Sequence, residues 1–176
     1  MSVTEEFEVF DWLKNYFPYA NIVEDNMPSV LHFCLMWSLF ESKVCEKHAS
    51  VGKIKSFTKR LSGTKSLKQE YLDPYLLYFQ KRYLRNGKTN DRFEKLRISS
   101  DYREHVESVL KKEETEKSSI VLVLLIIIYR LRNNLFHGEK PILTLNDQNI
   151  NFNVANRFLA KVLDLHKNIR QKSIIS

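Results

Sequence analysis

The most constraining feature of the chain is an unbroken apolar run from Ile120 to Tyr129, with Lys117 before it and Arg130 after it. The run is shorter than the roughly 20 apolar residues that a membrane span requires. A helix that is apolar on every side has to be covered by neighbouring elements. We therefore expect a buried central helix over residues 118–137, within a soluble core and not in a membrane.

The rest of the sequence favours other helices packed around this one. The chain has 176 residues, 43% of them hydrophobic, and only 4 Gly and 4 Pro. Apolar residues recur at helical spacing, and nothing alternates with period two for long. We expect an all-α bundle of about five to seven helices in a single domain over residues 1–176, with a core over about 28–170 and an N-terminal helical extension over 1–25.

Capping and turn-forming residues predict the helix boundaries. Ser2 and Glu5 have capping-box spacing, and the first helix is expected to end near Pro18. Pro28 opens a second helix that runs to about His48. A weakly helical segment is expected over 50–68, followed by a helix from Asp73 to a stop at Asn86-Gly87. A capping box at Asp101 and Glu104 opens the next helix, and the charged run 111–117 marks a turn or a helix bend. The central helix is expected to stop at Gly138 and Pro141, and a final amphipathic helix to run from about Asn149 to Ile169.

The cysteines and the N-terminus indicate a cytoplasmic location. Cys34 and Cys45 are eleven positions apart in the expected second helix, about 16 Å along its axis, so they cannot pair with each other. The first residues are acidic, whereas a secretory signal begins with basic residues.

Positive charge is concentrated in the middle of the chain. The net charge is +7, and residues 51–97 hold 13 Lys or Arg against 4 Asp or Glu, a local charge of +9. Cations interleaved with aromatic rings are typical of sites for single-stranded RNA. The predicted RNA-binding residues are Lys81, Arg82, Arg85, Lys88 and Arg92, with Tyr71, Tyr75, Tyr78, Phe79 and Tyr83 as stacking rings. The alternative is a solvated basic face whose rings belong to the core.

A cluster of polar residues closes the apolar helix. Asn133 and His137 are four residues apart and share a helix face, and Arg132 is long enough to reach the imidazole. The simpler interpretation is a C-terminal turn in which Arg and His offset the helix dipole before a Gly cap at Gly138.

Arg132-Asn133, three intervening residues, then His137-Gly138 resembles the Arg-Asn-x-x-x-His motif of HEPN domains, in its prokaryotic branch. The segment Leu35–Glu41 is similar in character to a helix of that branch, so the resemblance spans roughly residues 28–170. It implies a HEPN-like bundle whose penultimate helix is long and buried, working as a homodimer with both motifs in one cleft. It also implies a metal-independent endoribonuclease without a cofactor, in a toxin or antiviral-defence role and restrained or triggered by an antitoxin or sensor protein.

The resemblance also suggests roles. His137 would take the ribose 2′-hydroxyl proton, Arg132 would hold the phosphate, and Asn133 would position. The products would be a 2′,3′-cyclic phosphate and a 5′-hydroxyl. HEPN toxins that are silenced by nucleotidylation carry a tyrosine two residues after the histidine, where this chain has Glu139, so that mode of silencing is not expected.

Glu41 lies on the apolar stripe of the expected second helix, and a carboxylate that faces a core needs a partner. Arg132 or Arg130 is one candidate, which would make Glu41 a residue that orients the arginine. The alternative is that Glu41 lies at the edge of the stripe in water.

Two other classes of function compete with the ribonuclease. One is a non-catalytic HEPN-like module that binds RNA, a nucleotide or a protein, and the other is a plain helical scaffold. No metal site is expected, because Cys45-x-x-His48 lacks two further ligands at suitable spacing.

Overall fold

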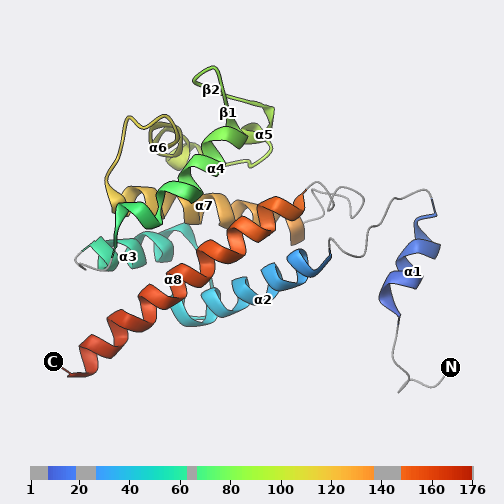
Figure 1. Cartoon of the computed structure of the whole chain (residues 1–176), viewed down its shortest axis with the longest axis horizontal. Helices are drawn as coiled ribbons and strands as arrows, with labels where there is room; N and C mark the ends of the chain where they lie inside the picture. Colours follow the sequence, from blue (N-terminus) through green and yellow to red (C-terminus); the bar gives the residue numbers. More distant parts are fainter. Residues whose placement is uncertain (1–7, 19–26, 63–66, 137–147, 176) are drawn as a thin grey trace.

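The computed structural model describes residues 8–18, 27–62, 67–136 and 148–175, with side chains up to Ile169 (Figure 1). Its elements are α1 (Val9–Tyr16), α2 (Met27–Val44), α3 (Val51–Ser62), the 3₁₀ turn η2 (Gln69–Tyr71), α4 (Asp73–Tyr83), β1 (Leu84–Arg85), β2 (Lys88–Thr89), α5 (Asp91–Glu94), α6 (Ser100–Leu110), α7 (Lys117–Phe136) and α8 (Asn149–Ile175). The predicted all-α class is confirmed. The described residues form eight α-helices, more than the five to seven expected, and the four-residue α5 is too short to show a helical period in the sequence.

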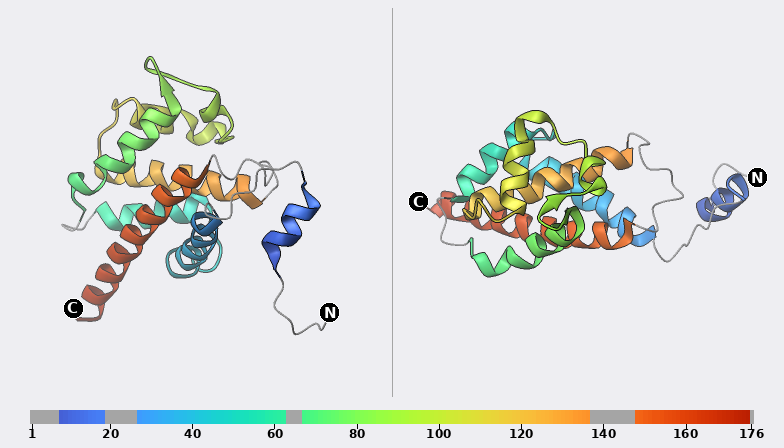
Figure 2. Two further views of the ribbon diagram at one scale, coloured as in Figure 1. Left: turned by 45° about the vertical axis from the view of Figure 1, so that its right-hand side comes forward. Right: turned by 90° about the horizontal axis from the view of Figure 1, so that it is seen from above.

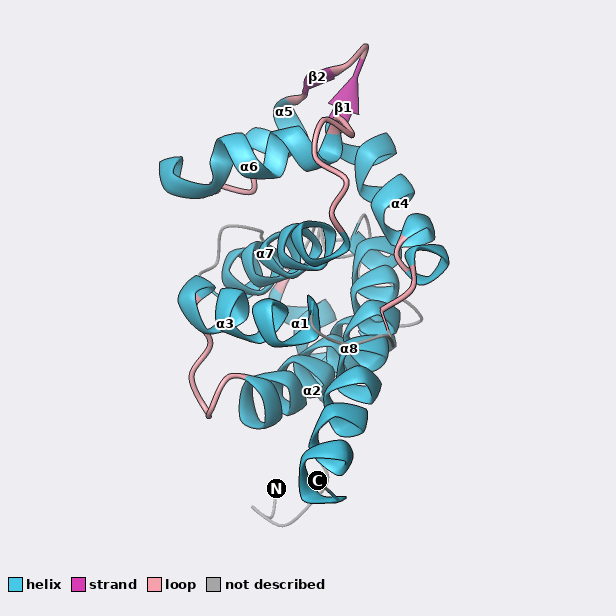
Figure 3. Cartoon of the chain, turned by 90° about the vertical axis from the view of Figure 1, so that its left-hand side faces the viewer, coloured by secondary structure: helices cyan, strands magenta, loops and turns pink. Residues whose placement is uncertain are grey.

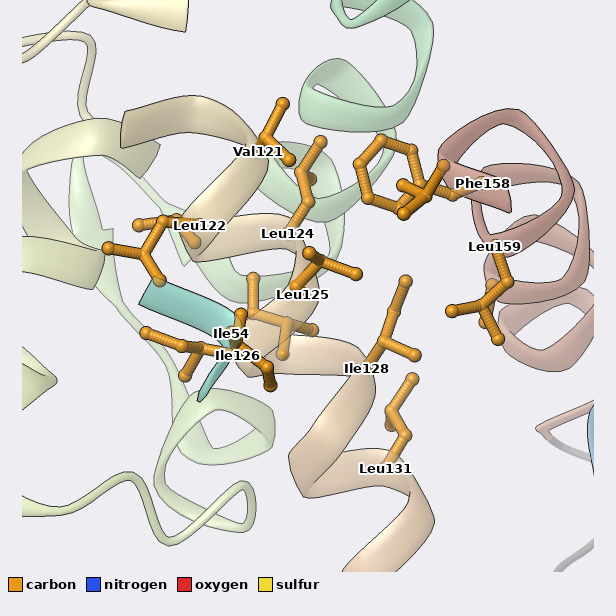
Figure 4. Packing of buried hydrophobic residues seen from close by; sticks show 14 of the residues in the cluster. Ile54, Val121, Leu122, Leu124, Leu125, Ile126, Ile128, Leu131, Phe158 and Leu159 are labelled. Carbon is orange, nitrogen blue, oxygen red and sulfur yellow. The ribbon is translucent and has the colours of Figure 1, made fainter. Parts of the chain in front are cut away.

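The central helix is α7, as the apolar run predicts. Every residue from Ile120 to Ile128 is buried. Figure 4 shows Ile54 of α3 and Phe158 and Leu159 of α8 around these side chains. Full burial of one such side chain contributes about 1.5–3 kcal/mol. Because the residues from Ile120 to Ile128 are all buried, α7 is the main hydrophobic element of the fold. At 20 residues it is also long and apolar enough to cross a membrane, a property that buried core helices share.

The helices α2 and α3 lie on one side of α7, and α4, α6 and the strands β1 and β2 lie on the other (Figures 2 and 3). The most extensive contacts join α2 to α8 and α3 to α7. Between α2 and α8 the rings of Phe33 and Phe152 lie 4.9 Å apart, and Asn156 Nδ2 donates to the carbonyl of Ser29 at 3.0 Å. Trp37 of α2 packs on Tyr129 of α7 at 5.9 Å, which places α2 beside the C-terminal part of the central helix.

The second helix is shorter than predicted. It ends at Val44 instead of His48, because Glu46 and Lys47 have left-handed φ values of 50° and 66°. The Lys47 amide then donates to the carbonyl of Glu41 at 3.0 Å and closes the helix end. Cys45 therefore lies one residue beyond the helix. Both cysteines are free, as expected.

The residues Asn86-Gly87 do not stop a helix; they form the turn of a hairpin. Both have positive φ, 53° and 74°, which is the conformation of a type I′ turn. In the antiparallel pair Leu84 lies opposite Thr89 and Arg85 opposite Lys88. The predicted stop is therefore wrong, since α4 already ends at Tyr83.

The remaining boundaries follow the sequence with small differences. The expected turn between Leu110 and Lys117 and the start of the last helix at Asn149 are confirmed. The capping box at Asp101 is not formed, because α6 begins at Ser100 after an N-cap without a side-chain bond. The other predicted boundary residues, Ser2, Glu5, Gly138 and Pro141, lie outside the described residues.

Candidate catalytic motif and nucleic-acid interface

Arg132 projects from the penultimate turn of α7 and is partly exposed. Its Nη1 donates to Asn133 Oδ1 at 3.2 Å, and its guanidinium carbon lies 5.0 Å from the centre of the Phe136 ring. The Nε atom is buried without a hydrogen-bond partner. Among the described residues no carboxylate forms an ion pair with Arg132, so its positive charge is not neutralised within this part of the chain. A guanidinium in this state suits an anionic ligand.

Asn133 is buried, with 9% of its surface exposed, and its carbonyl oxygen is occupied by Arg132. The side chain of Asn133 therefore contacts the arginine and exposes little surface to a ligand, while its positioning role stays a prediction. The third member of the motif, His137, lies outside the described residues, and so does Glu139.

Arg130 and Asn134, on either side of Arg132 and Asn133 in α7, bind backbone carbonyls of a distant segment, which the sequence did not reveal. Arg130 Nε donates to the carbonyl of Leu96 at 2.7 Å, and Asn134 Nδ2 donates to the carbonyl of Lys95 at 2.9 Å. The two side chains are four residues apart and share a helix face. They attach residues 81–96, which carry the predicted RNA-binding cations and are called the basic segment below, to the helix that carries Arg132. Their i,i+4 spacing is visible in the sequence, but nothing in the sequence identifies the carbonyls they bind.

Most of the predicted RNA-binding cations are free for a ligand. Lys81, Arg85, Lys88 and Arg92 are exposed, together with Lys95. The hairpin that carries Arg85 and Lys88 projects from the bundle beyond α4 and α5 (Figure 1). Its cations therefore lie on an element that protrudes from the bundle beyond α4.

Arg82 differs from the other four. Its Nη2 donates to Gln148 Oε1 at 3.3 Å and its Nε is buried without a partner. Gln148 Oε1 also accepts from Asn151 Nδ2 at 2.6 Å, and Asn151 Oδ1 accepts from the Tyr78 hydroxyl at 2.6 Å. This polar network joins the end of α4 to the start of α8. Arg82 is therefore first a structural residue, which the sequence did not distinguish from its exposed neighbours.

The predicted stacking rings divide into two groups. Phe79 and Tyr83 are buried in the core, and burial raises the pKa of the Tyr83 hydroxyl far above its ordinary value. Tyr71, Tyr75 and Tyr78 are partly exposed. Burial also raises the pKa of Tyr75 and of Tyr78, and nearby arginines partly oppose it. The core alternative is thus correct for Phe79 and Tyr83, and Tyr75 and Tyr78 also pack against the core although they are partly exposed.

The carboxylate of Glu41 is used within its own loop. Its Oε1 accepts from the Ala49 amide at 2.8 Å, eight residues along the chain. This bond fixes the turn between α2 and α3. Glu41 is half-buried and partnered by backbone, an arrangement that neither sequence-based alternative included.

Neither a metal site among the described residues nor a match to a known protein was found. No group of three or more His, Cys, Asp or Glu side chains in this part of the chain is placed to hold a metal ion. No protein-family model matches the chain, and comparisons with curated proteins and with solved structures find no match.

Proposed function

We propose that this chain is a metal-independent endoribonuclease of HEPN type that binds RNA on its basic segment and cuts it at the end of α7. The observation that carries the proposal is the pair of bonds from Arg130 and Asn134 to the Leu96 and Lys95 carbonyls. They fix the end of the basic segment, which carries the exposed Lys95, to the helix of Arg132, whose own charge has no acidic partner among the described residues. RNA that follows the cations is thereby led to the motif.

The chemistry needs a base, a charge-stabilising group and the RNA itself. His137 takes the proton of a ribose 2′-hydroxyl, and the oxygen attacks the adjacent phosphorus. The bond from phosphorus to the 5′-oxygen breaks, leaving a 2′,3′-cyclic phosphate and a 5′-hydroxyl. The guanidinium of Arg132 stabilises the charge that develops on the phosphoryl oxygens, and Asn133 orients it.

A second chain completes the site, because one His137 supplies a base but no separate acid for the leaving 5′-oxygen. We expect a two-fold dimer in which the partner donates that proton. The outward side of α2 supports a dimer: Leu31, Leu35 and Leu39 form an apolar stripe that is 60%, 60% and 40% exposed. Trp37 on the opposite side of α2 packs against Tyr129, so the stripe lies on a helix adjacent to the motif helix.

A toxin or antiviral-defence role, with an antitoxin or sensor protein that restrains or triggers cleavage, is the biology that the motif resemblance suggests. The rival function is a non-catalytic module that binds RNA, a nucleotide or a protein and uses the motif as a helix end. The contacts of Arg132 with Asn133 and Phe136 are compatible with both.

One gel separates these functions. A short RNA and the same RNA with one 2′-deoxy position are incubated with the full chain, with and without excess EDTA. Cleavage should persist in EDTA and stop at the deoxy position. His137→Ala should lower the rate by about 10²–10⁴-fold while RNA binding stays nearly intact. Arg132→Ala should reduce both binding and cleavage.

Two variants serve as matched controls. His48→Ala changes an exposed histidine in the loop before α3, and Arg60→Ala changes an exposed arginine in α3. Neither should alter the rate. Cleavage at the deoxy position, or full activity of His137→Ala, would overturn the proposal. RNA binding without any cleavage would favour the binding module.

A further inference from the structure

A seam of three tyrosines runs between α4 and α8. Tyr71, Tyr75 and Tyr78 recur at spacings of four and three residues along η2 and α4. Tyr78 donates to Asn151 Oδ1, and the Tyr75 ring meets the edge of Phe158 with the ring centres 5.0 Å apart. Tyr71 lies at the far end, below the ammonium group of Lys161, which is 4.4 Å from the ring centre. The tyrosines thus follow α8 from its first turn to its middle.

The Tyr71 end of this seam is hollowed. The hollow has a volume of about 570 Å³, and its polar lining consists of Lys68, Tyr71, Lys161, Asp164, Lys167 and Asn168. Lys68 Nζ lies 5.6 Å from the centre of the Tyr71 ring, on which Lys161 also rests. Three lysines against one aspartate make the lining positive, and Glu70, 3.5 Å from Lys68, is a solvent-exposed partner. We name this feature the Tyr71 hollow.

We propose that the Tyr71 hollow is a second phosphate-binding subsite, which holds the backbone of the same RNA away from the cleavage point. This inference depends on the proposed function. The ring of Tyr71 holds the ammonium groups of Lys161 and Lys68 without neutralising them, since a cation–π contact leaves the formal charge in place. Lys161 forms no ion pair among the described residues, and the pair of Lys68 with Glu70 is solvent-exposed and therefore weak, so both lysines can contact a phosphate.

The position of the hollow sets the length of RNA that reaches it. Lys161 lies twelve residues after Asn149, the first residue of α8, which corresponds to about 18 Å along the helix. In Figure 1 that first turn of α8 lies at the same end of the bundle as the C-terminal end of α7. The exposed Arg157 lies between the two ends of this path. A short oligonucleotide bound at the motif does not span the path, whereas a longer one does.

The test compares an RNA of about 4 nucleotides with one of about 16, the two ends of the range that single-strand binding folds cover. Binding is measured by fluorescence anisotropy at several salt concentrations, in the His137→Ala protein so that the RNA stays intact. The variant is Lys68→Gln with Lys161→Gln. For the long RNA, the double variant should make the negative slope of log affinity against log salt less steep by about 1.4, since each neutralised phosphate contributes about 0.7. Between about 50 and about 200 mM salt, the parent protein, which carries only His137→Ala, should then lose about sevenfold more affinity for the long RNA than the double variant does.

Two control proteins separate phosphate binding from general charge and from packing. Lys43→Gln with Lys59→Gln removes two exposed charges from α2 and α3 and should leave the slope unchanged. Lys68→Arg with Lys161→Arg keeps both charges and should retain the slope of the parent.

An unchanged slope for the long RNA would overturn the inference, and so would equal losses for both RNA lengths or for the α2 and α3 control. Saturation of the hollow by a free mononucleotide, seen as chemical-shift changes at Tyr71 that long RNA does not compete away, would show a separate anion site and also overturn it. In these outcomes the RNA still binds and the proposed function stands. If the parent protein binds neither RNA, the proposed function fails with it.

Discussion

Asn134 on the motif helix donates its side-chain amide to the backbone carbonyl of Lys95 at 2.9 Å, and so joins the central helix to the basic segment. Asn134 is almost completely buried, with 3% of its surface exposed. Asn134→Ala removes this bond and should lower the free energy of unfolding by about 1–3 kcal/mol. Urea unfolding measures the change, and Asn153→Ala, an exposed position on α8, is the control. A loss no larger than that of the control would mean that the bond does not hold the segment in place.

The two kinds of arginine on the basic segment should respond differently to substitution. Arg85→Gln with Lys88→Gln removes charges on the exposed hairpin and should weaken RNA binding more at low salt than at high salt, with stability unchanged. Arg82→Gln breaks the network with Gln148 and should lower stability by about 1–2 kcal/mol. Anisotropy and thermal unfolding on the same samples make the comparison. Equal salt effects and equal stability for the two proteins would contradict it.

Glu41 should act on the loop after α2 and not on the chemistry. Glu41→Gln retains an oxygen that accepts from the Ala49 amide, so the protein should unfold and cleave like the unmodified chain. Glu41→Ala leaves that amide without its partner and should cost about 1–2 kcal/mol of stability. A cleavage rate that falls in Glu41→Gln, with unfolding unchanged, would instead assign the carboxylate to the orientation of Arg132.

Cys45 should make stability depend on alkaline pH. Burial, with a smaller contribution from Glu41, raises the pKa of its thiol to about 11 from an ordinary value of 9.0. The unfolded chain therefore loses this proton at lower pH than the folded chain, so the stabilising effect is complete below pH 9 and is lost as the pH rises towards 11. The loss is on the order of 2–3 kcal/mol. Urea unfolding across this range should show a steeper decline for the unmodified chain than for Cys45→Ala, and parallel curves would refute the assignment.

The leucine stripe of α2 offers a test of the dimer. Leu35→Glu places a charge on the apolar face and should yield a monomer at micromolar concentration with cleavage greatly reduced, because burying an unpaired carboxylate is costly. Leu77→Glu, at a leucine of α4 that is 48% exposed, should remain dimeric. Light scattering gives the mass of each variant. A Leu35→Glu protein that stays dimeric would place the interface elsewhere.

Periodicity predicted the elements whose burial is strong, because the same side chains that produce the pattern also produce the core. The run Ile120–Tyr129 led directly to α7, and the spacing from Phe152 to Ile169 led to α8. Asn86-Gly87 was misassigned because positive φ serves both a helix stop and a hairpin turn, and the strands it joins are only two residues long.

The partners of polar side chains could not be predicted in the same way. Arg82 and Arg85 look alike in the sequence, yet Gln148 binds only the first, and that pairing spans 66 residues of chain. Glu41 was expected to face water or an arginine, but left-handed residues after α2 bring the Ala49 amide back to it. Such contacts depend on how the elements meet in space. The position of Arg132 at the end of the buried helix was foreseeable, whereas the attachment of the basic segment beside it was not.

The late place of α7 and α8 in the chain has a consequence for synthesis on the ribosome. The helices α2 and α3 have their main packing surfaces on α8 and α7, so the first hundred residues cannot complete their core when they emerge. Their apolar faces stay exposed to chaperones until translation reaches the final third of the chain. Arg132 and His137 are themselves encoded in that final third, and the helix that covers α2 follows them. A product that stops before α8 therefore lacks the main packing partner of α2, and the bundle around Arg132 stays incomplete.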